Sequence, residues 1–232
     1  MDVDQPSPES VRFGGGEVEA HPKREPILRA PWPPLLLAGV IVVLYALQTQ
    51  AAEPSALIER FGFSPEAMQR GHWGGLITAL FVHGNWTHAI LNALFLLAFG
   101  TPVARLFGTR AIGAGGFFTF YFLCGALSSL GFAAVHPASS SVLVGASGAI
   151  AGLMAASSRL IERRGVLSGF TSRPVLGMAA AWVAVNLVVA VIGLNFGGGD
   201  MPIAWEAHLV GYAVGLFLIG PVVRIFAKAD RF

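Results

Sequence analysis

The chain has few charged residues: Lys, Arg, Asp and Glu together make up 12% of its 232 residues. Soluble domains carry roughly 25% charge, whereas 54% of this chain is hydrophobic and its mean hydropathy is +0.66. This composition excludes an ordinary soluble domain and is typical of an integral membrane protein. A formal net charge of +2, with no clustered basic patch, predicts no nucleic-acid partner.

The sequence also has only one cysteine and no recognised metal-binding motif. The single cysteine, Cys124, lies in apolar sequence, which excludes a disulfide framework and a zinc site with the usual ligand spacing. There is no His-Glu-x-x-His motif, and no aspartate lies inside an apolar stretch, since Asp200 stands alone in a connection. The sequence therefore predicts neither a metalloprotease nor an aspartyl intramembrane protease, and it predicts no metal or other cofactor.

Six apolar stretches are long enough to cross a bilayer, which takes roughly 17 to 25 residues. The predicted spans are Pro33–Thr49, Thr87–Ala104, Ala111–Val135, Ser141–Ser158, Pro174–Leu194 and Ile203–Phe226. The predicted fold is an all-α polytopic membrane protein, with a six-transmembrane-helix bundle over residues 33–228. Residues 1–32 are polar and rich in Pro, Gly and charge, so we expect a disordered cytoplasmic tail there, and a short cytoplasmic end over residues 229–232. No apolar stretch begins before Leu35, so we expect no secretory signal peptide.

The basic residues predict an orientation. With six spans, the basic residues of the tail, of residues 105–110, of residues 159–173 and of the C-terminal end all lie on one side. Only Arg60 and Arg70 lie on the other side, in the long connection between the first two spans. By the positive-inside rule both termini are cytoplasmic. The connection itself is partly apolar, which predicts a segment that lies in the membrane interface instead of crossing it.

Polar residues stand out on three of the six spans. Ser147 lies on the fourth span, His208 on the sixth, and His88 with Asn92 on the second. An unpaired imidazole is unfavourable in hydrocarbon, so intramembrane histidines are functional candidates. Counting helical residues from the predicted outer ends puts Ser147 and His208 roughly 8–9 Å deep, with Asn92 at a similar level. Together these residues could supply a nucleophile, a base and oxyanion donors.

Each of these residues also has a structural interpretation. Serine is common in membrane helices, where it binds a neighbour or its own backbone. His208 could form an interhelical hydrogen bond or relay protons in a transporter, and His88 with Asn92 could be a structural polar pair. A channel or transporter would need polar residues along the whole path, and the cytoplasmic halves of the spans lack them.

Glycines accompany the polar residues at helical spacing. Gly148 lies four residues before Gly152, while Gly211 and Gly215 lie on the same face as His208. Small residues allow close packing of membrane helices. This pattern predicts that the fourth and sixth spans approach closely enough for an imidazole to reach a hydroxyl, which takes about 2.6–3.2 Å. Glu206 lies on a different face from His208, so a serine–histidine dyad without an acid is expected.

These motifs, taken together, resemble the rhomboid family of intramembrane serine proteases. The matching residues are His83-x4-His88-x3-Asn92, Gly145-Ala146-Ser147-Gly148 and Ala207-His208-x2-Gly211-x3-Gly215, and the loop that ends at His83 also looks like the family's first loop. The resemblance implies that Ser147 is the nucleophile and His208 the general base. It also implies an oxyanion hole formed by the Ser147 N–H, His88 and Asn92, and a loop shaped by Gly145.

The resemblance further implies a substrate class and a location. Substrates would be single-span membrane proteins in the lipid bilayer, cleaved near the outer end of their transmembrane helix. The six-span form looks bacterial, which implies the cell (inner) membrane and a site open to the periplasmic or extracellular side. The alternative is a catalytically silent rhomboid-like protein that binds or escorts membrane helices, although such relatives typically lose the serine or histidine kept here. The sequence makes no prediction of oligomeric state.

Two positions depart from the family pattern. Trp73 is followed by Gly74, where the family loop usually carries arginine, and Ala151 occupies a position often held by an aromatic that stacks on the catalytic histidine. Tyr212, or another aromatic, is the candidate to take that second role. His83 is expected to hold the connecting segment in place.

Overall fold

The computed structural model describes residues 30–162, 165–192 and 204–229. In this part of the chain the only strand-like pairing is an isolated bridge between Phe63 and Leu143. The elements are α1 (Trp32–Thr49), α2 (Pro54–Phe61), α3 (Pro65–Gln69), α4 (Gly75–Thr78), the 3-10 turn η1 (Ala79–Phe81), α5 (Trp86–Phe107), α6 (Ala111–Val135), α7 (Ser147–Ser158), α8 (Arg173–Ile192) and α9 (Trp205–Ala229). The prediction of an all-α fold is confirmed. The predicted N-terminal tail and C-terminal end lie almost wholly outside the described residues.

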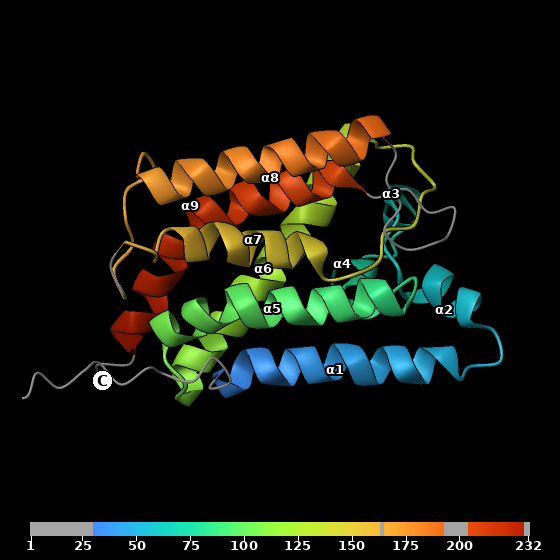
Figure 1. Cartoon of the computed structure of the whole chain (residues 1–232). Helices are drawn as coiled ribbons and strands as arrows, with labels where there is room; N and C mark the ends of the chain where they lie inside the picture. Colours follow the sequence, from blue (N-terminus) through green and yellow to red (C-terminus); the bar gives the residue numbers. More distant parts are fainter. Residues whose placement is uncertain (1–29, 163–164, 193–203, 230–232) are drawn as a thin grey trace, which may run out of the picture.

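Among the described residues, five helices, α1, α5, α6, α8 and α9, are long and apolar enough to cross a membrane. They run side by side, and the first residues of α1 and the last of α9 lie at the same end of the bundle (Figure 1). Large apolar side chains on the outside are exposed, among them Leu47 (61%), Val191 (84%) and Phe217 (60%). An apolar surface of this kind is unfavourable in water and suits lipid. The chain is a multi-pass membrane protein, and the cellular orientation of its ends stays a prediction.

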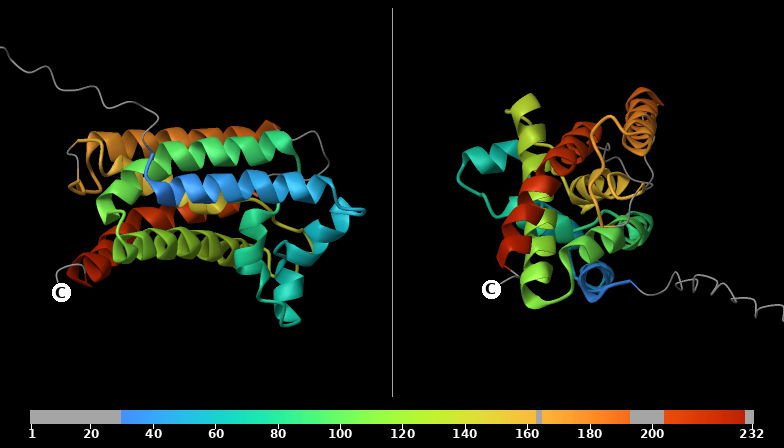
Figure 2. Two further views of the ribbon diagram at one scale, coloured as in Figure 1. Left: turned by 90° about the horizontal axis from the view of Figure 1, so that it is seen from below. Right: turned by 90° about the vertical axis from the view of Figure 1, so that its left-hand side faces the viewer.

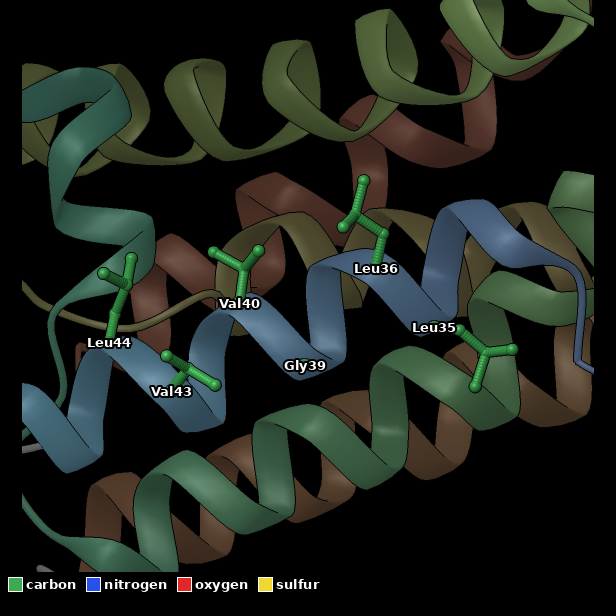
Figure 3. A pocket seen from close by; sticks show the side chains of 6 residues that line it. All are labelled: Leu35, Leu36, Gly39, Val40, Val43 and Leu44. Atoms are coloured by element: carbon green, nitrogen blue, oxygen red, sulfur yellow. The ribbon is translucent and has the colours of Figure 1, made fainter.

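The outward face of α1 illustrates this lipid-facing surface. It carries a shallow apolar groove with open space above Gly39 (Figure 3). The groove is lined by Leu35, Leu36, Gly39, Val40, Val43 and Leu44. None of the predicted site residues lies there.

The prediction of a helix from Ser141 is wrong, because residues 141–146 are not helical and α7 begins at Ser147. At 12 residues α7 is too short to span a bilayer. It lies in the middle of the bundle (Figure 2, right), in contact with α5, α6, α8 and α9, and its residues 148–158 are all buried. Non-helical backbone is tolerated at membrane depth when protein surrounds it. The depth of Ser147 therefore depends on the loop before it, and a count of helical residues from Ser141 does not give it.

The connection between α1 and α5 forms the short helices α2, α3 and α4 and does not cross the bundle. These helices gather at one end and extend to the side of α6 (Figure 2), against which α4 packs. Pro54 and Pro65 begin α2 and α3, and the Ser64 hydroxyl caps α3 by accepting a hydrogen bond from the Ala67 N–H at 3.1 Å. The observed path agrees with the prediction that this connection does not cross the membrane. Its location in the membrane interface stays a prediction.

Candidate active site

Ser147 and His208 meet where α7 and α9 begin. Ser147 is the first residue of α7, and His208 lies in the first turn of α9. The His208 Nε2 is 2.8 Å from the Ser147 Oγ, a hydrogen-bond distance within the range needed for proton transfer. The sequence pattern predicted this contact between two residues that are 61 positions apart.

Two pairs of glycines allow α7 and α9 to come this close. A Cβ on Gly211 would collide with the Gly148 carbonyl oxygen, and a Cβ on Gly215 would collide with the Gly152 carbonyl oxygen. The two backbones are thus in direct contact over two successive turns. The predicted small-residue packing is present, and it holds the imidazole and the hydroxyl within reach of each other.

The start of α9 is tied to α6 by polar contacts. The Ser128 hydroxyl donates to the Ala207 carbonyl oxygen at 2.6 Å, directly before His208. The Glu206 side chain contacts the residue after the C-terminal end of α6, where its Oε1 is 3.0 Å from the His136 Nε2. Glu206 therefore does not orient His208, as expected from its position on the helix.

The residue that does contact the far side of His208 was missed by the sequence analysis. Asn186, on α8, is 1% exposed, and its Oδ1 is 3.2 Å from the His208 Nδ1. Its Nδ2 donates to the Trp182 carbonyl oxygen at 2.8 Å. The sequence contains one indication of this role: Asn186 is the single amide side chain within the apolar stretch Pro174–Leu194. Polar side chains in membrane spans are functional candidates.

An aromatic side chain also lies beside His208, and it comes from α8. The Trp182 ring centroid is 5.8 Å from that of His208, with 42° between the ring planes. The Trp182 Nε1 lies 3.4 Å from the His208 carbonyl oxygen. Trp182 also packs against a buried apolar cluster that includes Ala151 and Tyr212. The contact to the histidine ring thus comes from Trp182 rather than from Tyr212.

The two predicted oxyanion donors lie on the first two turns of α5. The Asn85 side chain caps this helix by accepting from the His88 N–H at 2.8 Å. The Asn92 Nδ2 donates to the His88 carbonyl oxygen at 2.9 Å, which orients its amide group. A Cβ built on Gly145 would lie 2.5 Å from the His88 Nε2 and 3.6 Å from the Asn92 Nδ2. Both side chains therefore border the loop that leads into Ser147.

This loop has a shape that requires glycine at position 145. Gly145 has a φ of +101°, a conformation that residues with a side chain rarely adopt. Its N–H donates to the Ala79 carbonyl oxygen at 2.8 Å. Two residues earlier, Leu143 exchanges two backbone hydrogen bonds with Phe63, at 2.7 and 2.9 Å. The lateral segment of α2 to η1 thus fixes the path of the chain into α7.

Gly74 lies in that lateral segment, and His83 follows its end. The Gln48 side chain binds the backbone of His83 through both its amide nitrogen (2.8 Å) and its amide oxygen (3.2 Å). The His83 side chain is fully buried beside the His88 ring, 5.0 Å between centroids, and neither of its ring nitrogens has a hydrogen-bond partner. Burial, with a smaller contribution from His88, lowers the pKa of His83 to about 3 although the Phe81 backbone opposes this. A side chain at position 74 would meet open space. The lateral segment is instead held by the Thr78 hydroxyl, which donates to the Phe61 carbonyl oxygen at 2.6 Å.

The arrangement is suited to acyl transfer. A hydroxyl stands beside an imidazole, at the N-terminal end of a helix where backbone N–H groups are free to bind an anion. Over residues 30–162, 165–192 and 204–229, no three His, Cys, Asp or Glu side chains lie together in a way that could hold a metal ion.

The sequence matches a known protein family. Residues 70–225 match the family model described as the Rhomboid domain, which covers the site residues from His88 to Gly215. RHOMBOID-like protein 5 of Arabidopsis thaliana is 28% identical over 153 residues, or 65% of this chain. The match spans 44% of that relative, less than half of its length. The family match extends over more than half of the chain, and the chain belongs to the rhomboid family.

Proposed function

We propose that this protein is an intramembrane serine endopeptidase that cleaves single-span membrane proteins near the outer end of their transmembrane helix. The observation that carries the proposal is the 2.8 Å contact between the Ser147 Oγ and the His208 Nε2 at the partly buried start of α7. A helix-packing serine would need no imidazole at this distance. Family membership supports the same conclusion at a coarser level.

The chemistry follows from the two side chains. The Ser147 Oγ attacks the carbonyl carbon of the peptide bond while the His208 Nε2 takes the hydroxyl proton. His208 then gives this proton to the departing amine, and an acyl-enzyme ester on Ser147 remains. Water, deprotonated by His208, hydrolyses the ester and restores the free hydroxyl. No metal or other cofactor takes part in this sequence.

Three donors are available for the negative charge that develops on the carbonyl oxygen. They are the N–H of Ser147, the ring of His88 and the Nδ2 of Asn92, which retains a second hydrogen after binding the His88 carbonyl. His88 and Asn92 both border Gly145, two residues before the nucleophile. Donors held in advance around a developing oxyanion give one of the largest contributions to catalysis.

The position of the site supports a membrane substrate. Ser147 lies inside the bundle, near the end where the lateral segment and the loop 136–146 gather. Peptide bonds in a membrane helix are hydrogen-bonded and shielded, so the substrate must unwind before attack. A helix end meets this requirement more easily than its centre, because terminal turns already lack some backbone hydrogen bonds.

Labelling with a fluorophosphonate probe tests the nucleophile without knowledge of the substrate. In detergent or liposomes we expect the unaltered protein to be labelled and Ser147→Ala and His208→Ala to remain unlabelled. Ser157→Ala is a matched control on the same helix, since the Ser157 hydroxyl binds only the Met154 carbonyl oxygen. His72→Ala, at an exposed position, is the matched histidine control. Labelling of Ser147→Ala equal to that of the unaltered protein would contradict the proposed mechanism.

Cleavage of membrane helices tests the substrate class. The protein is reconstituted in liposomes with single-span model proteins that carry a small residue and weak helix formers near one end of the helix. We expect cleavage near that end, mapped by mass spectrometry, and none with Ser147→Ala. Binding of these helices without cleavage or probe labelling would instead support the catalytically silent, helix-binding alternative.

A further inference from the structure

We infer that Asn186 is a positioning residue, which holds the His208 imidazole with its proton on Nδ1 and so leaves Nε2 free to accept the Ser147 proton. The role of this tautomer in catalysis rests on the proposed function. The contact itself rests on the side chains of α8 and α9, so it can be tested separately.

The direction of the Asn186 amide is set by its own helix. A carbonyl oxygen only accepts hydrogen bonds, so the group facing the Trp182 carbonyl at 2.8 Å must be the amide nitrogen of Asn186. The amide oxygen is then the atom that faces His208, at 3.2 Å from Nδ1. A backbone carbonyl on α8 thus determines which end of Asn186 meets the imidazole.

The direction of the amide in turn determines the tautomer of His208. Because the amide oxygen cannot donate, the hydrogen bond at 3.2 Å exists only when Nδ1 carries the proton. In the neutral ring the lone pair then lies on Nε2, which faces the Ser147 hydroxyl at 2.8 Å. The other tautomer would put a lone pair on Nδ1 opposite the amide oxygen, so that contact would be lost. Its Nε2–H would donate to the Ser147 oxygen, and Nε2 could then not take the hydroxyl proton.

Burial makes this constraint strong. Asn186 is 1% exposed, whereas its neighbours on α8 face outward, with Val185 and Leu187 both 51% exposed. An amide enclosed by apolar surface has no water to replace a lost partner, and an unpaired buried polar group costs about 1–3 kcal/mol. Loss of the hydrogen bond to His208 would therefore leave the Asn186 oxygen buried without a partner, which favours the tautomer that keeps this bond.

Trp182 restricts the same imidazole from another direction. It lies four residues before Asn186, hence on the same face of α8, and its ring lies beside that of His208. One face of α8 thus provides both an aromatic contact and a hydrogen bond to the histidine. Trp182 limits tilting of the ring, while only Asn186 distinguishes its two nitrogens.

The first test is the tautomer of His208, read from the nitrogen chemical shifts of protein labelled with ¹⁵N-histidine, with the His208 signals identified by their loss in His208→Ala. We expect the Nδ1–H form in the unaltered protein and a mixture or the Nε2–H form in Asn186→Leu. The exposed substitution Val185→Ala on the same helix should leave the signals unchanged. An unchanged tautomer in Asn186→Leu would overturn the inference, whatever the catalytic activity of the protein.

The second test is kinetic and uses cleavage of a model substrate. We expect Asn186→Leu to lower kcat at least about tenfold with little change in KM, since a base held in the wrong tautomer can lose up to ~10⁴ in rate. Asn186→Asp retains an oxygen opposite Nδ1 and should recover most of the lost rate, which distinguishes positioning from a packing defect. Equal kcat in Asn186→Leu and the unaltered protein would contradict the inference. Absence of cleavage in the unaltered protein would instead contradict the proposed function, and the tautomer measurement would still decide the positioning role.

Discussion

The carbonyl oxygen of Gly148 occupies the space in which a side chain on Gly211 would have to lie. One turn further into the bundle, Gly152 and Gly215 have the same relationship. The contact between α7 and α9 is therefore made by backbone, and its distance determines whether the His208 ring reaches the Ser147 hydroxyl.

Gly215→Ala tests this contact. The added methyl group would collide with backbone of α7, and overpacking of this kind typically costs about 1–3 kcal/mol. We expect a lower thermal unfolding midpoint in detergent and slower probe labelling of Ser147. Gly220→Ala, on the same helix but with open space around the new methyl, is the control and should not lower the midpoint. An unchanged unfolding midpoint in Gly215→Ala would show that α7 and α9 can move apart without loss of stability.

Gly145→Ala tests the loop before the nucleophile. The backbone at this position has a φ of +101°, and a methyl group would lie 2.5 Å from the His88 Nε2, so the loop must change shape. We expect cleavage to fall by at least about tenfold, because a small misplacement of reacting groups can cost 10²-fold in rate. Gly177→Ala on α8, where a methyl meets open space, should keep full activity. The measurement is the initial rate on a model substrate at matched protein amounts.

Removal of single oxyanion donors should slow catalysis without abolishing probe access. We expect Asn92→Ala and His88→Ala each to reduce kcat by ~10²–10³, the range measured when one such donor is lost. KM should change little, because the interaction strengthens only as charge develops on the substrate oxygen. If either variant altered KM alone, that side chain would bind substrate rather than stabilise the oxyanion.

His83 predicts a pH dependence of stability. Its pKa in the folded protein is about 3 because the ring is buried, with His88 adding to this effect, whereas an exposed histidine titrates near 6.5. Below pH 6.5 the unfolded chain therefore binds a proton that folded His83 does not, and stability is lost as the pH falls from 6.5 towards 3, by up to ~1.4 kcal/mol per pH unit. We expect His83→Phe to reduce the fall in thermal midpoint between pH 7.5 and 5. His72→Phe, at an exposed position, should show the same fall as the unaltered protein.

The long helices were predictable because length and hydropathy determine them. The predicted third span, Ala111–Val135, agrees with α6 at both ends, and the first differs from α1 by one residue. The fourth failed because hydropathy does not distinguish apolar loop from apolar helix. Residues 141–146 are as apolar as a helix end, but their path is determined by backbone pairing with Phe63 and Ala79, which are distant in sequence.

The meeting of Ser147, His208, His88 and Asn92 in one region was also predictable, because polar residues in apolar spans are few and glycine spacing indicated which helix faces pack together. Asn186 and Trp182 were not found. Both lie on α8, which has no glycine pattern and, apart from Arg173 at its first position, no second charged or amide residue to indicate the face that meets His208. Which side of an apolar helix faces the protein depends on tertiary packing, and the periodicity of α8 gives little information about it.

The anchoring of the loop before α7 has a consequence for how this chain can change in length. Leu143 is paired with Phe63, Gly145 is bound to Ala79, and helical geometry begins at Ser147, so four successive residue steps join three fixed points. An insertion or deletion of one residue there would rotate or withdraw the nucleophile from the imidazole. The exposed residues 52–53, between α1 and α2, have no such backbone pairing, and the turn there can accept additional residues. Natural and engineered variation in length should therefore be tolerated in the turn after α1 and be absent from residues 143–147.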